Sequence, residues 1–224
     1  MHSALQGVLA VAEKDARSEL RTRVGLTSVV LFIVTTVSVI VFALADEPVP
    51  RPLAVTLLWV VMFYTAMSGL GRAFVGEQDR GTAFYLRLHT LPLAVYFGKL
   101  AVNLLMALLS NLAALVLMLF FVPSISVGSI STLLVAVGVG SVGLAAVLTI
   151  VSAIVAQTGT RNPLLPVLSF PLLVPVILPG VKATLYALAG MGLSEAASDL
   201  MLMAAYSGIV IVVSTFVFDV VWAD

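Results

Sequence analysis

The sequence of 224 residues contains no cysteine and few charged side chains. The absence of cysteine excludes disulfide bonds, thiolate metal sites and covalent thioether attachment of a cofactor. Charged residues make up 10% of the chain and hydrophobic residues 61%, a balance that excludes a disordered chain and a soluble globular fold. The formal net charge is zero, so nothing in the composition argues for a nucleic-acid partner.

The sequence also lacks the motifs that would mark an enzyme. It contains no Gly-x-x-x-x-Gly-Lys-Ser/Thr loop, so we do not expect the chain to bind ATP itself. His-Glu-x-x-His and Gly-x-Ser-x-Gly are missing as well. The two histidines, His2 and His89, fall outside the long apolar runs, which leaves no imidazole at membrane depth to ligate haem or a metal. We therefore expect a chain that is not an enzyme and holds no cofactor or metal of its own.

Apolar runs long enough to cross a bilayer recur along the chain, and a helix needs about 20 residues to do so. Because the runs are continuous rather than alternating, they predict helices and not barrel strands. The fold class that follows is an all-α membrane protein with six spans. These spans are Gly25–Ala45, Leu53–Gly71, Phe97–Val122, Thr132–Ala156, Leu164–Leu178 and Ala196–Val221.

The first 24 residues form a separate element ahead of these spans. On a helical wheel Leu5, Leu9 and Leu20 share one arc. The basic residues on the opposite arc are Lys14, Arg17 and Arg21. The pattern predicts an amphipathic interfacial helix over 1–24, followed by a transmembrane domain over 25–224. Its basic face suits anionic lipid or a partner, and a simple anchor for the first span would show the same pattern.

Basic residues are distributed unevenly between the predicted loops. Nine of the 11 Lys and Arg residues fall on one side, and only Arg51 and Lys182 fall on the other. The positive-inside rule therefore places both termini in the cytoplasm. Trp59, Tyr96 and Trp222 lie near predicted span ends, as aromatic residues of the membrane interface do.

The longest charged loop, residues 72–96, is the best candidate for contact with a partner. Thr82 is placed to cap a short new helix over 82–90. Phe84 and Leu88 are four residues apart and share a face, so this helix is expected to be amphipathic. An energy-coupling subunit could bind such a helix, but most charged loops are solvated interfacial loops, and sequence position alone favours that alternative.

Eight residues of this loop are the candidate coupling residues: Glu77, Asp79, Arg80, Gly81, Thr82, Phe84, Arg87 and Leu88. The spacing of the acidic residues and His89 matches no metal-ligand pattern. We therefore expect Glu77 and Asp79 to form ion pairs with Arg80 and Arg87.

The third span carries polar side chains inside a long apolar run. Lys99 stands at its start and is expected to reach out to the membrane interface. Asn103, Ser110 and Asn111 follow, and polar side chains in a span must face protein or water. They are candidates for a conduit or for helix packing, of which packing is commoner. In the fourth span a series of small residues predicts a helix-packing or dimer face: Gly138, Gly140, Ser141, Gly143 and Ala145.

The fifth span contains a series of prolines: Pro163, Pro166, Pro171, Pro175 and Pro179. Each internal proline removes a backbone hydrogen bond, so we expect the span to be short or locally unwound. The next segment, 181–195, is then expected to be a re-entrant or surface helix on the external side. Pro171 and Pro175 are further candidates for the conduit or packing role.

Three stretches in this order resemble the cytochrome c maturation protein B family, the membrane subunit of the bacterial haem exporter, which is similar to ABC-2-type permeases. The first is the entry helix, with Glu13-Lys14-Asp15 and Ser18-Glu19-Leu20-Arg21-Thr22-Arg23. The second is the loop, with Phe74, Glu77-x-Asp79-x-Gly81-Thr82, Leu91-Pro92-Leu93 and Gly98-Lys99. The third is the fourth loop and fifth span, with Arg161-Asn162, Leu164-Leu165-Pro166-Val167-Leu168, Pro171-Leu172 and Pro175-Val176. The chain departs from the family at Ala83-Phe84, where Leu-Glu is usual.

The resemblance implies a permease subunit in the bacterial cytoplasmic (inner) membrane. It implies a homodimer bound to two copies of a separate cytoplasmic ABC ATPase, together with other cytochrome c maturation proteins that handle haem. The alternatives are an ABC-2-type permease for another lipid, drug or polysaccharide, a membrane scaffold without transport, and an intramembrane enzyme. The missing catalytic motifs disfavour the last of these.

Overall fold

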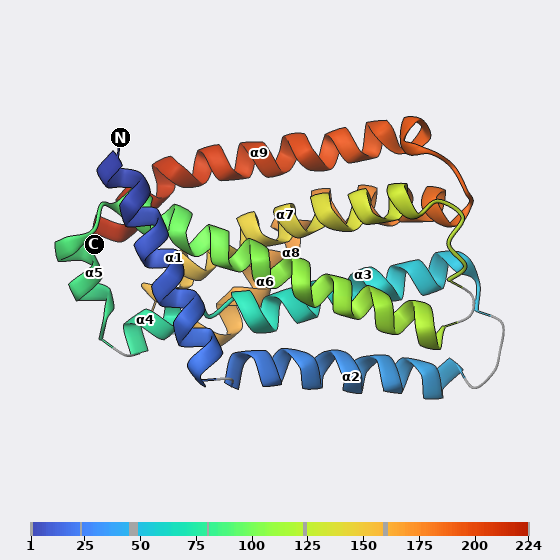
Figure 1. The fold of residues 1–224 in the computed structure, drawn as a ribbon, viewed down its shortest axis with the longest axis horizontal. Coiled ribbons are helices and arrows are strands. Elements are labelled where there is room, and N and C mark those ends of the chain that lie inside the picture. The colour runs from blue at the N-terminus through green and yellow to red at the C-terminus, as the bar shows by residue number, and fades with distance from the viewer. Residues whose placement is uncertain are drawn as a thin grey trace.

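The computed structural model describes residues 2–22, 24–44, 49–79, 81–122, 125–158 and 161–223. All regular secondary structure in these residues is helical. The helices are α1 (His2–Thr22), α2 (Val24–Leu44), α3 (Arg51–Leu70), α4 (Val75–Asp79), α5 (Ala83–His89), α6 (Pro92–Phe121), α7 (Ile130–Ala156), α8 (Arg161–Leu188) and α9 (Leu193–Ala223). The long helices α2, α3 and α6 to α9 run along the bundle, and α1 crosses it obliquely near one end (Figure 1). The short helices α4 and α5 lie at this same end, together with the start of α1 and the end of α9.

Five helical stretches of the described residues are long and apolar enough to cross a membrane. They are Arg51–Asp79, Pro92–Phe121, Ile130–Ala156, Leu164–Leu188 and Leu193–Trp222. The first predicted span corresponds to a shorter apolar stretch, Thr27–Ala43 of α2. The chain is therefore a multi-pass membrane protein by length and composition, with five long apolar helices and a shorter sixth.

The centre of the bundle is α7, whose small residues allow close packing as predicted. A Cβ atom built on Gly143 would lie 2.7 Å from the Val176 side chain of α8 and 2.9 Å from Ser207 Oγ of α9. Gly138, by contrast, has open space around its Cα. One side of α7 thus accepts two neighbouring helices at short range because it carries glycine there.

Trp59 of α3 lies fully buried between α7 and α8. The suggestion from the sequence that it is an aromatic residue of the membrane interface is therefore wrong. Its Nε1 donates a hydrogen bond to Thr184 Oγ1 at 3.0 Å. A Cβ atom on Gly140 or Gly180 would come within 2.4 Å or 2.3 Å of its ring. Tyr96 and Trp222, expected at the interface for the same reason, are buried as well.

The prediction for the fifth span is wrong, because α8 is one continuous helix that contains Pro166, Pro171, Pro175 and Pro179. Inside a bundle, neighbouring helices and hydroxyl side chains can compensate for the bonds that prolines remove. Tyr206 of α9 donates to the Leu172 carbonyl at 2.6 Å, which ties this part of α8 to its neighbour.

No separate helix exists over 181–195 in the described chain, since residues up to Leu188 extend α8 and Leu193 begins α9. The two helices are joined by a turn in which Gly190 has φ +81°, a backbone conformation that favours glycine. The turn packs on the segment before α7, where Ser129 N–H donates to the Ala187 carbonyl at 2.8 Å.

Candidate functional site

The predicted short helix is present as α5, and its apolar side chains face away from the bundle. Phe84 is 69% exposed, Tyr85 65% and Leu88 64%, whereas Ala83 and Leu86 are buried. The amphipathic pattern therefore gives α5 one face for the protein core and another, apolar face that the chain itself leaves open.

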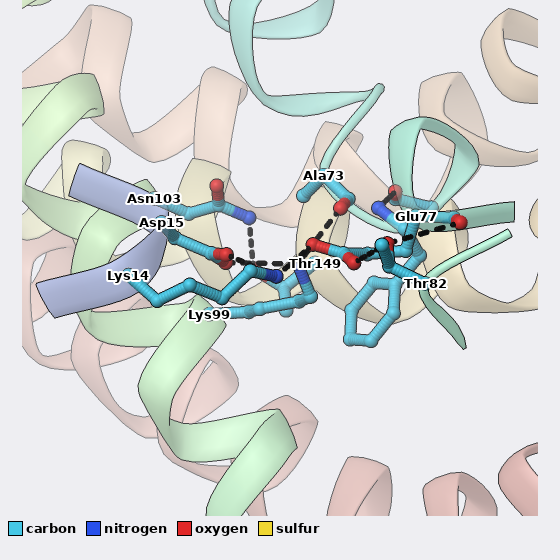
Figure 2. Close-up of polar contacts among 10 residues, drawn as sticks. Lys14, Asp15, Ala73, Glu77, Thr82, Lys99, Asn103 and Thr149 are labelled. Atoms are coloured by element: carbon cyan, nitrogen blue, oxygen red, sulfur yellow. Dashed lines mark hydrogen bonds and ion pairs between the residues drawn. The ribbon is translucent and has the colours of Figure 1, made fainter. Parts of the chain in front are cut away.

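A cluster of charged side chains joins α1, α4 and α6 next to the start of α5 (Figure 2). Glu77 of α4 is 1% exposed, and its Oε1 accepts hydrogen bonds from Lys14 of α1 and from Lys99 Nζ of α6, the latter at 3.2 Å. Lys99 is 2% exposed and also donates to Asp15 Oδ2 at 2.8 Å and to the Ala73 carbonyl at 3.0 Å. A buried ammonium group has three donors to satisfy, and these acceptors match them.

The expected position of Lys99 is wrong, and so is the expected pairing of Glu77 with Arg87. Lys99 does not reach the membrane interface, because the buried acceptors of α1 and α4 hold its ammonium group. Glu77 pairs with lysines rather than with Arg87, which instead lies over the Trp222 ring of α9 at 5.2 Å from its centroid. Arg80 lies outside the described residues, and Asp79 is exposed.

Thr82 connects Glu77 to α5. Its N–H donates to the Glu77 backbone carbonyl at 3.0 Å, and its hydroxyl donates to the Glu77 carboxylate. The predicted side-chain cap at Thr82 is absent: the residue has helical backbone angles, φ −84° and ψ −12°, whereas a capping residue is typically extended. Gly81, with φ +68°, makes the reversal between α4 and α5 possible.

An aromatic cluster secures the same region to the end of α9. The Phe74 ring lies 5.3 Å from that of Phe218 and 5.7 Å from that of Trp222, and Tyr96 lies 5.4 Å from Phe218. Phe74 N–H also donates to Ser152 Oγ of α7 at 3.1 Å. The base of α4 is therefore packed among α6, α7 and α9.

The N-terminal helix α1 packs directly on the start of α6. A Cβ atom on Gly98 would lie 2.7 Å from Val11 Cβ, so glycine is required for this approach. Of the three predicted basic-face residues, Arg17 and Arg21 are exposed, while Lys14 turns into the charge cluster. Arg17 pairs with Glu13 one turn away on the same helix.

The polar residues of α6 make hydrogen bonds between helices. Asn103 donates to Thr149 at 2.8 Å and Asn111 donates to Ser141 at 2.9 Å, both on α7. Ser110 bonds only within its own helix, to the Ala107 carbonyl at 3.2 Å. These contacts have the character of helix packing, the commoner of the two predicted roles.

The two prolines proposed with these residues lie elsewhere. Pro171 and Pro175 are on α8, Pro171 exposed and Pro175 partly buried. The structure therefore does not bring them together with the α6–α7 hydrogen bonds.

Sequence reasoning missed Asp15 and Lys99 as members of the charge cluster. A signal was present, because a lysine inside an apolar run needs a nearby acceptor. What the sequence does not supply is the partner, since 84 residues separate Asp15 from Lys99. Among the described residues there is no group of His, Cys, Asp and Glu that could hold a metal ion.

Comparison with known proteins identifies the family. The family model described as CcmB protein matches residues 6–221, which is nearly the whole chain. A search of curated proteins gave no match. The chain therefore belongs to the CcmB protein family and is a transmembrane component of the cytochrome c maturation system.

Proposed function

We propose that this chain is the membrane permease subunit of an ABC transporter for cytochrome c maturation, driven by a separate cytoplasmic ATPase that docks on α5. The observation that carries the proposal is the exposed apolar face of Phe84, Tyr85 and Leu88 at one end of the bundle. A continuous apolar face of this kind outside the long helices is typical of a protein contact. Asp79 and Arg87 supply polar contacts, with Arg80 a further candidate on sequence alone, whereas buried Glu77 is withdrawn from direct contact.

The proposal places both termini and α5 in the cytoplasm, with six passes through the bacterial inner membrane. Support comes from the distribution of basic residues over the structure. Lys14, Arg17 and Arg21 lie on α1, at the end of the bundle that carries α5, whereas Arg51 begins α3 at the opposite end. Positive charge of this kind favours the cytoplasmic side.

In this proposal two copies of the chain form a homodimer that binds two copies of the ATPase and associates with other cytochrome c maturation proteins. Haem is handled by the assembled complex, and this chain contributes no haem ligand from within its spans. Support comes from the positions of the histidines, since His2 belongs to α1 and His89 to α5.

The double variant Phe84→Asp/Leu88→Asp tests the docking role of α5. Charged side chains would meet an apolar slot on the ATPase, and losing two apolar anchors should lower ATPase recovery at least about tenfold. The measurement is affinity purification of the tagged chain from detergent-solubilised membranes, followed by mass spectrometry of the co-purified proteins.

The control is Met191→Asp, which introduces one such carboxylate at an exposed apolar side chain in the turn at the opposite end. The control should recover the ATPase at the wild-type level. Undiminished ATPase recovery with the α5 variant, at equal amounts of chain in the membrane, would refute docking on α5.

A further inference from the structure

One carboxylate connects the exposed helix α5 with the membrane helices. Thr82, immediately before α5, bonds to both the backbone and the side chain of Glu77. The same carboxylate accepts from Lys99, eight residues into α6, and from Lys14 on α1. Thus α5, α1 and α6 meet at a single buried side chain (Figure 2).

The connection continues along α6 into the centre of the bundle. One turn beyond Lys99, Asn103 donates to Thr149 of α7 at 2.8 Å. The Ala73 carbonyl, just before α4, accepts from Lys99 at 3.0 Å. A shift of α4 therefore cannot occur without either moving α6 or breaking a buried ion pair.

A purely stabilising role would not require charge at these positions. A buried ion pair gives little net stability, because desolvation offsets the attraction, and an apolar pair of similar size often serves as well. Removing Glu77 alone, by contrast, leaves two lysines, Lys14 and Lys99, beside the single carboxylate of Asp15, so one positive charge of the cluster is uncompensated. The pair therefore favours one discrete arrangement of α4 against α6 and disfavours small sliding displacements between them. A contact that transmits movement from one helix to another needs this property.

We propose that the Glu77–Lys99 pair is the positioning joint that transmits movement of the docked ATPase from α5 to α6. The inference rests on the proposed function, since it takes α5 as the docking helix. It adds that binding and transmission are separable, because Glu77 is buried and does not contact the partner. Loss of the pair then uncouples ATP hydrolysis from cytochrome c maturation while the ATPase stays bound.

The test uses the complete complex with Glu77→Gln and with Glu77→Gln/Lys99→Met. The double variant removes one charge of each sign, and the remaining Lys14 and Asp15 still pair with each other at 3.1 Å, so the thermal stability of the wild-type complex should be kept. In both variants we expect wild-type recovery of the ATPase and a fall of about tenfold or more in cytochrome c matured per ATP hydrolysed, a coupling loss of usual size. The readouts are haem staining of cytochrome c in cells and ATPase activity of the purified complex.

The matched control is Glu13→Gln, which removes an exposed carboxylate of α1 that pairs only with Arg17 in the described structure. It should leave both readouts unchanged. Wild-type maturation by the double variant would assign the pair to stability and overturn the inference. Absence of both variants from the membrane would assign it to folding and overturn the inference as well. These outcomes would overturn the inference and leave the proposed function standing. The proposed function itself fails if recovery of the ATPase does not depend on α5.

Discussion

Several polar side chains inside this bundle reach across to a neighbouring helix. Trp59 bonds to Thr184 of α8, Asn103 to Thr149 of α7 and Asn111 to Ser141 of α7. Such hydrogen bonds join membrane helices because an unmatched polar group in an apolar environment is costly. At this scale each bond fixes the orientation of one helix against one neighbour.

The Trp59–Thr184 bond allows a prediction about stability. Thr184→Val removes the acceptor and leaves the buried Trp59 N–H unpaired, which should lower the free energy of unfolding by about 1–3 kcal/mol. The shift can be measured as a fall in the thermal unfolding midpoint of the purified protein in detergent.

The comparison variant is Thr56→Val on α3, where the hydroxyl is exposed and bonds only to the Pro52 carbonyl of its own segment. Its cost should stay within about 0.5 kcal/mol. Equal shifts for the two variants would show that the Trp59 hydrogen bond contributes nothing measurable.

The sequence predicts which polar residues need a partner but not which partner they find. Asn103 and Asn111 were expected to face protein, and they do. Lys99 was assigned to the membrane interface because its buried acceptor Asp15 is remote along the chain. Long-range pairing depends on how the helices pack, and no local pattern encodes it.

At the scale of single elements, glycine position decides how closely α7 meets its neighbours. Gly143 faces Val176 and Ser207 at distances that exclude a methyl group, while Gly138 faces open space. Both residues lie inside the same helix, so each has the same intrinsic cost in helix propensity relative to alanine.

Gly138→Ala and Gly143→Ala should therefore shift stability in opposite directions. Alanine at 138 should raise the free energy of unfolding by about 0.5–1 kcal/mol through helix propensity. Alanine at 143 should lower it by about 1–3 kcal/mol, because the new methyl group overpacks α8 and α9. Thermal unfolding of both variants in the same detergent gives the comparison, and a loss of stability at 138 as large as at 143 would contradict this account.

Element boundaries were predictable where the chain carries strong local signals. The helix after Gly81 appears as α5, with Phe84 and Leu88 on one face. The continuity of α8 was not predictable, since the sequence shows the hydrogen bonds that prolines remove but not the neighbouring helices that compensate for them.

At the scale of the whole molecule, the bundle has two chemically different ends. One end carries α4, α5, the charge cluster and the start of α1, and the other carries the turn at Gly190. In the proposed orientation the first end is cytoplasmic, as the positive-inside rule favours.

The cysteine-free sequence permits a direct test of this orientation. Arg17→Cys and Met191→Cys place single thiols at exposed positions at opposite ends. A membrane-impermeant maleimide added to spheroplasts should label position 191, and should label position 17 only after the membrane is permeabilised. The reverse pattern would put α5 outside the cell and exclude a cytoplasmic ATPase as its partner.

The long sequence separation within the charge cluster has a consequence for biogenesis. The ribosome makes α1 before α6, and Lys99, the buried lysine that pairs with Asp15, emerges 84 residues later. During that interval α1 has no α6 to rest on, and its charged residues stay hydrated at the bilayer surface. Packing of α1 against α6 is thus among the later events of assembly, and a nascent chain truncated before Lys99 lacks the buried ion pair that holds α1 in place.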